Sequence, residues 1–394
     1  MTRLRQSPLV VVFLTVFIDL IGFGIVIPLL PLYAKAHDPT PAQLGLLMAS
    51  FSGMQFLFAP LLGRLSDQVG RRPVVLLSLA GTVGSYLLFA FARTLGGLFL
   101  SRILAGVAGG NIATAQAVIA DVTAPEERSR GMGLIGMAFG LGFIFGPALS
   151  GLAVRIGEAW PGLFAAALSA TALVWALLAL PETRPAGGRA ARSAVPLQGV
   201  ARAFSRPAVA SLLVLGAVST TAFAGLEATF ALFLSARFDA SPSGVAWAFV
   251  GVGVAAALVQ GGLIRPLVRR LGELRLVTAG AVLLLLGFAL LLRTSSVPFL
   301  VASLAPMILG WGVTTPALSG LVSRRTPPAE QGETLGTFQS MSALGRILGP
   351  YWGASSFLRM GPAGPFGTGL ILEGAALLLA GSQFVRERRA LTGC

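Results

Sequence analysis

The chain has 394 residues, of which 55% are hydrophobic and only 11% are charged. Soluble domains carry about 25% charged residues, so this composition excludes an ordinary soluble protein and indicates repeated crossing of a bilayer. The net charge of +14 would also suit a nucleic-acid partner, but the placement of the basic residues, given below, makes that partner unnecessary.

Apolar runs long enough to span a membrane recur along the chain, separated by short breaks that are polar or contain Pro and Gly. About 20 mostly apolar residues suffice for a helix to cross the hydrocarbon. We therefore predict an all-α polytopic membrane protein with twelve transmembrane helices, at 9–33, 42–63, 74–92, 96–121, 132–154, 161–181, 207–235, 243–264, 275–293, 297–322, 334–358 and 365–385.

The first run carries Asp19 in its middle, is too long for a signal-peptide core and lacks a small-residue cleavage site after it. We expect it to be retained as a helix. The only cysteine is Cys394 and the only histidine is His37, so no site of cysteines and histidines for a metal is expected. Without a Ser/His/Asp set or a phosphate-binding loop, neither a hydrolase nor an ATP-driven pump can be assembled, and no cofactor is predicted.

The basic residues favour one side of the membrane. If the N-terminus is cytoplasmic, most of the 29 Lys and Arg residues fall in inner segments, and the outer loops hold one each: Lys35, Arg93, Arg155, Arg237, Arg293 and Arg359. By the positive-inside rule both termini are then cytoplasmic. We predict a multi-pass protein of the cell inner (plasma) membrane whose partners are the lipid bilayer, protons and a small molecule, and not nucleic acid.

The chain contains an internal repeat. Seven pairs of identical residues recur at a constant offset of 203: Thr123 and Thr326, Pro125 and Pro328, Glu127 and Glu330, Gly133 and Gly336, Gly142 and Gly345, Gly146 and Gly349, Pro147 and Pro350. Between the two copies lies an Arg-, Pro- and Gly-rich segment. We therefore predict an N-terminal six-helix bundle at 1–181, a cytoplasmic linker at 182–206 and a C-terminal bundle at 207–394, an arrangement typical of alternating-access carriers.

Four stretches resemble motifs of the major facilitator superfamily. Segment 63–73, GRLSDQVGRRP, resembles its signature loop, and 102–106, RILAG, its second motif. Segment 142–151, GFIFGPALSG, resembles the antiporter motif of drug/proton exporters, and 19–31 the opening of the tetracycline-exporter branch. The resemblance implies a twelve-helix drug/proton antiporter. Unlike tetracycline exporters, however, the chain has no carboxylate in its third and ninth predicted helices, which argues against tetracycline as the substrate.

Asp67, Arg71 and Arg72 lie at the predicted inner face, where they can pair with one another, with a helix end or with lipid headgroups. Topology marking alone explains the arginines but not the acid, since acids contribute little to orientation. The resemblance implies a latch that closes the cytoplasmic side in the outward-facing state, with Gly63 and Gly70 letting the helices approach.

The antiporter motif places Gly142, Gly146, Pro147 and Gly151 in the fifth predicted helix. Small residues at such spacing let helix backbones come close. Proline removes a backbone donor and predicts a bend. Packing alone explains the glycines, while a bend between the two halves would also serve their rocking, so the two interpretations stay open together.

Four ionisable residues lie deep in predicted helices: the acids Asp19 and Glu227, in equivalent helices of the two halves, and the bases Arg102 and Arg346. Each costs about 2.5 to 3.5 kcal/mol at a helix centre, so a compensating role is expected. One alternative is a pair of static ion bridges. The other, which we favour, is a proton-coupling switch, because burial favours a neutral carboxylate and a nearby arginine a charged one. Glu373, in the twelfth predicted helix, receives less weight.

Candidate substrate-binding residues are polar or aromatic positions within the spans, although packing or interface anchoring explains each equally well: Gln55, Asn111, Gln116, Trp311, Gln339 and Trp352. Apolar walls with a few polar groups suit a drug-like ligand. We predict a monomeric, proton-coupled antiporter that exports small lipophilic or drug-like molecules and confers multidrug resistance. The alternative with the same fold is a symporter or uniporter of a sugar or metabolite; a sensor or a membrane enzyme fits less well.

Overall fold

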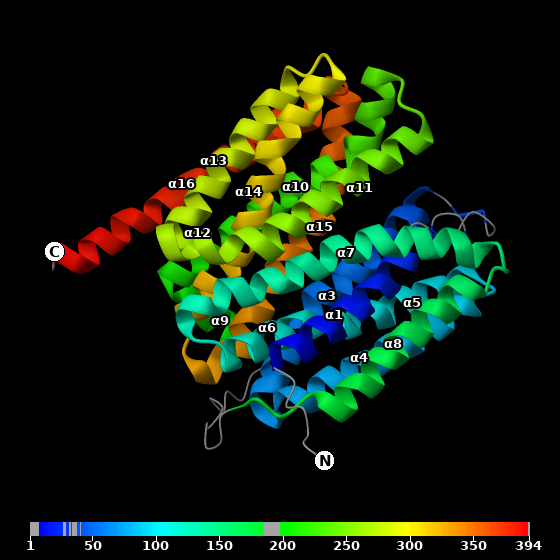
Figure 1. Ribbon diagram of the computed structural model, residues 1–394, viewed down its shortest axis with the longest axis horizontal. Coiled ribbons are helices and arrows are strands. Elements are labelled where there is room, and N and C mark those ends of the chain that lie inside the picture. The colour runs from blue at the N-terminus through cyan, green and yellow to red at the C-terminus, as the bar shows by residue number, and fades with distance from the viewer. Residues whose placement is uncertain are drawn as a thin grey trace. The chain divides into compact units, whose positions relative to one another are not determined.

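A computed structural model describes residues 8–26, 29–30, 33, 38–39, 41–184 and 198–392. Lys35, His37, Cys394 and residues 185–197 of the predicted linker lie outside these ranges. Within them the chain forms helices and no strands (Figure 1), which confirms the predicted all-α class. Helix α9 (Gln198–Ser205) occupies the end of the segment predicted as a linker.

The chain divides into two compact units. The first comprises Met1–Ala124, Ala138–Val200 and Pro327–Ser340, and the second comprises Pro125–Met137, Ala201–Thr326 and Met341–Cys394. Each unit thus combines most of one half of the sequence with a short segment of the other. The division into bundles at 1–181 and 207–394 stays a prediction.

The helices of the N-terminal half are α1 (Pro8–Val26), α3 (Pro41–Val69), α4 (Arg71–Ala90), α5 (Leu95–Ala108), α6 (Asn111–Val122), the single turn η2 (Pro125–Glu127), α7 (Arg128–Val154) and α8 (Trp160–Ala179). In the first unit α8 packs against both α1 and α4, and α5 packs against α3 and α4. Their shared core is aliphatic and aromatic, with Ile25, Leu47, Phe89 and Leu98 fully buried.

The helices of the C-terminal half are α10 (Pro207–Phe238), α11 (Pro242–Leu258), the π-helical turn η3 (Val259–Leu263), α12 (Ile264–Leu271), α13 (Glu273–Leu292), α14 (Val297–Arg324), the turn η4 (Pro328–Glu330), α15 (Gln331–Met360) and α16 (Gly364–Thr392). In the second unit α13 packs along α14, and α16 packs against α10 and α13. Phe230, Phe233, Phe288 and Phe366 fill the core between them.

In the described part of the chain, each of the twelve predicted spans overlaps a helix. Eleven segments there are long and apolar enough to cross a membrane. At the remaining predicted span α15 is long enough, but polar residues such as Gln339 and Arg346 make it less apolar. The fourth predicted span is two helices, α5 and α6, which meet at Gly109 and Gly110.

Short polar side chains set several helix starts. The Thr94 hydroxyl accepts the N–H of Gly97 at the start of α5, and the Ser241 hydroxyl accepts the N–H of Gly244 at the start of α11. Such caps satisfy backbone donors that have no acceptor within the helix. They place the ends of these helices within a few residues of the predicted limits.

Candidate functional site

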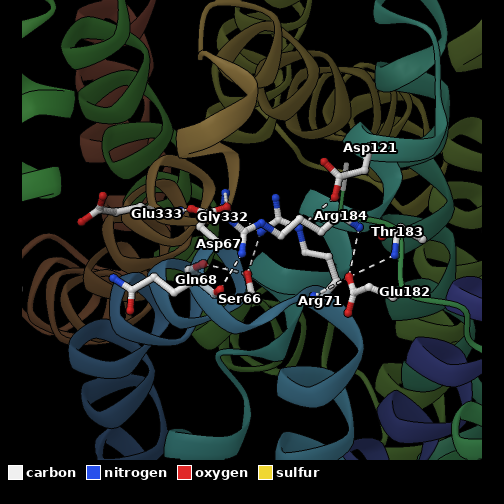
Figure 2. A network of polar contacts seen from close by, with 11 residues as sticks. Ser66, Asp67, Gln68, Arg71, Asp121, Glu182, Thr183, Arg184, Gly332 and Glu333 are labelled. Atoms are coloured by element: carbon white, nitrogen blue, oxygen red, sulfur yellow. Dashed lines mark hydrogen bonds and ion pairs between the residues drawn. The ribbon is translucent and has the colours of Figure 1, made fainter. Parts of the chain in front are cut away.

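The signature loop forms a buried polar network where α3 meets α4 (Figure 2). The Arg71 guanidinium donates through Nη1 to Asp67 Oδ1 at 2.6 Å and through Nε to Asp121 Oδ2 at 2.8 Å. Nη1 also donates to the Ser66 hydroxyl at 2.8 Å. Arg71 is only 1% exposed and Asp67 only 5%. One arginine thus binds two buried acids, an arrangement in which charge-assisted hydrogen bonds are strong.

Asp67 also binds the beginning of α15, within the first unit. Its Oδ1 accepts the N–H of Gly332 at 3.0 Å, and its Oδ2 accepts the N–H of Glu333 at 2.8 Å. These N–H groups belong to the first turn of α15, where they have no acceptor within the helix and where the helix dipole favours an anion. A side chain at Gly63 would collide with the Gly332 carbonyl oxygen, so this contact needs glycine.

Glu182 completes the network from the segment after α8. Its carboxylate accepts the N–H of Arg71 at 2.9 Å and the N–H of Arg72 at 3.2 Å, the first two residues of α4. Gly70, which precedes them, has φ +105°, and a side chain there would collide with Glu182 Oε2. The carboxylate therefore caps α4 from a distant part of the chain.

Two further backbone groups, the N–H of Thr183 and of Arg184, donate to Glu182 at 3.0 Å each. Burial raises the pKa of Glu182, but the four N–H donors together outweigh it and lower the pKa below its ordinary value of 4.5. The Arg184 guanidinium donates to the Gln68 carbonyl, and that of Arg72 donates to the Leu177 carbonyl at 2.7 Å. The α3–α4 loop is thus tied to the end of α8.

The predicted coupling acid Asp19 lies on α1 and accepts a hydrogen bond from the Ser169 hydroxyl of α8 at 3.0 Å. The side chain of Asn111, a predicted substrate residue, also hydrogen-bonds it. Both partners are neutral. The half-buried carboxylate therefore has two hydrogen-bond partners in the first unit, and none of the described residues is a counter-ion to it.

Arg102 is not placed against Asp19. Its guanidinium lies over the Phe51 ring, 5.0 Å from the centroid, and the side chain is 2% exposed. Its Nη2 atom has no hydrogen-bond partner in the described structure. Tyr86 interacts electrostatically with both Asp19 and Arg102. Cation–π contact alone is a weak substitute for an anion in a desolvated site.

In the second unit, Glu227 and Arg346 interact electrostatically, so these two predicted residues do come together. Many protein atoms lie around the Glu227 carboxylate, but the residue as a whole is exposed. Glu373 is fully buried on α16 and accepts the Ser219 hydroxyl of α10 at 3.2 Å, while its Oε1 has no partner in the described structure.

The antiporter glycines pack against α1. A Cβ on Gly24 would lie 2.5 Å from the Gly142 carbonyl oxygen, and one on Gly146 would lie 2.5 Å from Gly24 Cα. The backbones of α1 and α7 therefore touch one to two turns beyond Asp19. Gly151 faces no atom within 4 Å, and α7 continues as one helix through Pro147, whose side chain lies outside the described structure.

The other predicted substrate residues have mostly structural contacts. Gln55 donates through Nε2 to the Gly109 carbonyl at 2.9 Å, and Gln339 donates to Gln116 Oε1 at 3.1 Å. Trp311 stacks on Phe223 with ring centroids 4.2 Å apart, whereas Trp352 is 49% exposed. In the described part of the chain no three His, Cys, Asp or Glu residues are grouped to hold a metal ion.

Sequence reasoning found Asp67 and Arg71 but did not assign Asp121, Ser66 or Glu182 to the network. Glu182 follows the sixth span in the run PET, and an acid there is the one signal that the sequence offered. Its contact lies 111 residues away along the chain, which no local pattern reveals.

The family model described as Major Facilitator Superfamily matches residues 12–350. The chain belongs to this superfamily. It is 33% identical to the class D tetracycline resistance protein of Salmonella ordonez over 354 residues, covering 88% of each chain. It is also 33% identical to human major facilitator superfamily domain-containing protein 10, over 91% of this chain and 89% of that protein.

A solved structure agrees with these relatives. The fold is similar to the crystal structure of the human organic anion transporter MFSD10 (TETRAN), with a TM-score of 0.85 and 31% identity, covering 96% of this chain and all of that one. The predicted superfamily, its fold and the resemblance to tetracycline exporters are thereby confirmed. The chain is a multi-pass membrane transporter of small molecules and not an enzyme.

Proposed function

We propose that the chain is a proton-coupled antiporter that exports small lipophilic or drug-like organic molecules by alternating access. The observation that carries the proposal is the contact of α7 with α1, where Gly142 and Gly146 pack on Leu20 and Gly24. Asp19 lies beside Leu20 on the same turn of α1. The antiporter motif thus touches the helix segment that carries a half-buried carboxylate, for which the described residues provide no counter-ion.

Protonation of Asp19 changes the hydrogen bonds at this contact. The charged carboxylate accepts from Ser169 and Asn111, whereas a protonated carboxyl also donates and so favours a different set of partners. Because α1 and α7 touch at the backbone, a shift of α1 is transmitted to α7. A proton taken up from outside and released inside can therefore drive outward movement of a substrate.

The contact of Asp67 with α15 serves as the gate in this proposal. It holds the first turn of α15 through two backbone N–H groups and is itself held by Arg71. A contact made through two backbone N–H groups of one helix turn suits a latch that closes in one state and opens in the other. We place this latch at the cytoplasmic end of the helices, following the positive-inside rule.

Organic anions are a second candidate class of substrate. Arg102 is buried with no acidic partner in the described structure, and a desolvated arginine is stabilised by an anion. The structural relative at 31% identity, human MFSD10, is an organic anion transporter. An anionic group of the substrate would supply the charge that Arg102 lacks, so Arg102→Gln should impair transport of anionic probes more than transport of cationic ones.

Everted membrane vesicles with an acidic interior test the function. Tetracycline, the cation ethidium and an anionic fluorescein dye are added separately, and a pH-sensitive dye reports proton release. At least one probe should release protons and be concentrated inside, and an uncoupler should abolish both effects in wild type. Asp19→Asn is the control. Accumulation of a probe inside the vesicles in the presence of the uncoupler would contradict proton coupling. Movement of a probe out of the vesicles together with protons would favour the sugar or metabolite symporter.

A further inference from the structure

The second unit contains a polar cluster that the sequence did not assign to function. The Arg324 guanidinium, at the end of α14, donates through Nη1 to Glu273 Oε2 at 2.6 Å. The other carboxylate oxygen, Oε1, accepts the Ser129 hydroxyl of α7 at 3.4 Å. Glu273 is 4% exposed and Ser129 is fully buried. Both oxygens of a buried acid are therefore engaged, one of them by the first turn of α7.

This cluster occupies the place in its unit that Arg71 and Asp121 occupy in theirs. Glu273 is the first residue of α13 and follows Gly272 at φ +76°, as Arg71 is the first residue of α4 and follows Gly70 at φ +105°. Each pairs with a residue at the end of the next long helical segment, Arg324 or Asp121. The two clusters therefore have matching positions, but the base and the acid are exchanged: the helix start carries the base in the first unit and the acid in the second.

The cluster also holds the segment that leads into α7. Glu127, in η2, binds Arg269 Nη2 at 3.3 Å and Arg265 Nε at 3.4 Å, both from α12. Two residues on, Ser129 packs so closely on α14 that a side chain at Gly320 would lie 3.0 Å from Ser129 Cα and collide with its hydroxyl. The start of α7 is thus bound in the second unit as the start of α15 is bound by Asp67 in the first.

Helix dipoles make the two clusters unequal. In the first unit the cation Arg71 stands at a helix N-terminus and the anion Asp121 near a helix C-terminus, both on the unfavourable end. The Glu182 carboxylate compensates by capping α4 beside Gly70. In the second unit each charge stands on its favourable end, and Gly272 faces no atom within 4 Å. The second cluster therefore needs no outside anion.

We propose that Glu273, Arg324 and Ser129 form a second latch of reversed charge, which holds the start of α7 and must open and close during transport. The proposal rests on the proposed alternating-access function. Because its charges agree with the helix dipoles, this latch is the more persistent of the two. Opening of the first latch is then expected to precede opening of the second.

The test uses full-length protein in which Cys394→Ser removes the native thiol and Ser129→Cys introduces a buried one. The introduced thiol keeps a weak hydrogen-bond donor. Its reaction with a maleimide measures how often the start of α7 leaves the cluster. With the ion pair intact this thiol should be protected, and Glu273→Gln or Arg324→Gln should raise its labelling rate several-fold. Because the two residues act as one pair, the double variant should add little to either single one.

Ser303→Cys is the matched control. Ser303 is also fully buried, but lies near the other end of α14, so labelling of a thiol there should stay constant if the variants remain folded. The exchanged pair Glu273→Arg with Arg324→Glu should restore part of the protection at position 129. Unchanged labelling at position 129 in both single variants, with the control thiol at position 303 still protected, would overturn the latch.

Transport of tetracycline, ethidium and the fluorescein dye is measured in the same vesicles. Glu273→Gln should lower turnover of the transported probe while the control thiol at position 303 stays protected. Wild-type turnover in Glu273→Gln, despite an exposed thiol at position 129, would overturn the role of the cluster in the cycle. Absence of proton-linked export in wild type would refute the proposed function alone, because the labelling comparison requires no substrate.

Discussion

Replacement of Asp67 by asparagine tests the first latch most directly. The carboxylate accepts three hydrogen bonds, from the Arg71 guanidinium and from the N–H groups of Gly332 and Glu333. Asparagine has nearly the same volume but only one acceptor oxygen, and its amide group presents donors where an acceptor is needed. The substitution therefore weakens the hold on α15 without opening a cavity.

The size of the effect follows from these contacts. A hydrogen bond to a charged group contributes about 1.5 to 3 kcal/mol, and a neutral one about 0.5 to 1.5 kcal/mol. With its oxygen at the Oδ1 position, asparagine keeps the bonds from Arg71 and Gly332, the second of which becomes a neutral bond, and loses the bond from Glu333, so the latched state should lose about 3 kcal/mol. Arg71 keeps Asp121 at 2.8 Å, so no buried charge is left unpaired and the larger penalty of about 3 to 5 kcal/mol does not apply. At about 1.4 kcal/mol per factor of ten, the open state should gain on the order of 100-fold in population.

The assay follows a thiol in the first turns of α15. Thr334 is 3% exposed, so Thr334→Cys with Cys394→Ser should be protected in wild type and labelled much faster in Asp67→Asn, with slower transport. Ser66→Ala, which removes one neutral partner of Arg71, should have a smaller effect. Ser85→Cys, buried within α4, controls for unfolding. Equal labelling and turnover of Asp67→Asn and wild type would refute the latch.

Three further predictions concern pH, coupling and packing. Because the folded pKa of Glu182 lies below 4.5, its stabilisation is complete above pH 4.5 and is lost as the pH falls through the folded value. The thermal midpoint of detergent-purified wild type should thus fall more steeply in acid than that of Glu182→Gln. Asp19→Asn with Glu227→Gln should abolish uphill transport driven by a pH gradient while probe binding persists; a stable double variant that still concentrates the probe would make both acids structural. Gly146→Leu should separate α7 from α1 and lower the thermal midpoint, whereas Gly151→Leu, which faces no atom within 4 Å, should not.

The fold could be predicted from the sequence because membrane helices are specified locally. Each needs only an apolar run of sufficient length, and the repeat at an offset of 203 indicates that the runs belong to two copies of one pattern. The differences have local causes. The fourth predicted span divides at Gly109 and Gly110, and the eighth contains the π-helical turn η3, which hydropathy does not register.

The polar network could be predicted only in part. The signature loop identified Asp67 and Arg71, since they lie four residues apart in one motif. Asp121 and Glu182 lie 50 and 111 residues from Arg71, and their contacts depend on how α6 and the end of α8 pack beside α4. Periodicity gives the face of a helix that is buried, but not which residue of another helix meets it.

Sequence symmetry and structural symmetry also disagree on which acids correspond. The sequence pairs Asp19 with Glu227, because both lie in the first helix of their half. In the structure, the contact of Asp19 on α1 with Ser169 on α8 corresponds to that of Ser219 on α10 with Glu373 on α16, with acid and hydroxyl exchanged.

The same exchange of partners separates the two clusters built on Arg71 and Glu273. The two halves thus keep contacts between equivalent helices, while the acidic side chain of each contact lies on the other helix of the pair. Equivalent positions therefore identify the contact, whereas the side chain that takes up a proton has to be located separately in each half. By this argument the acid of the second half that matches Asp19 in its partner, a serine hydroxyl of the packed helix, is Glu373, while Glu227 differs from both in having Arg346 close to it.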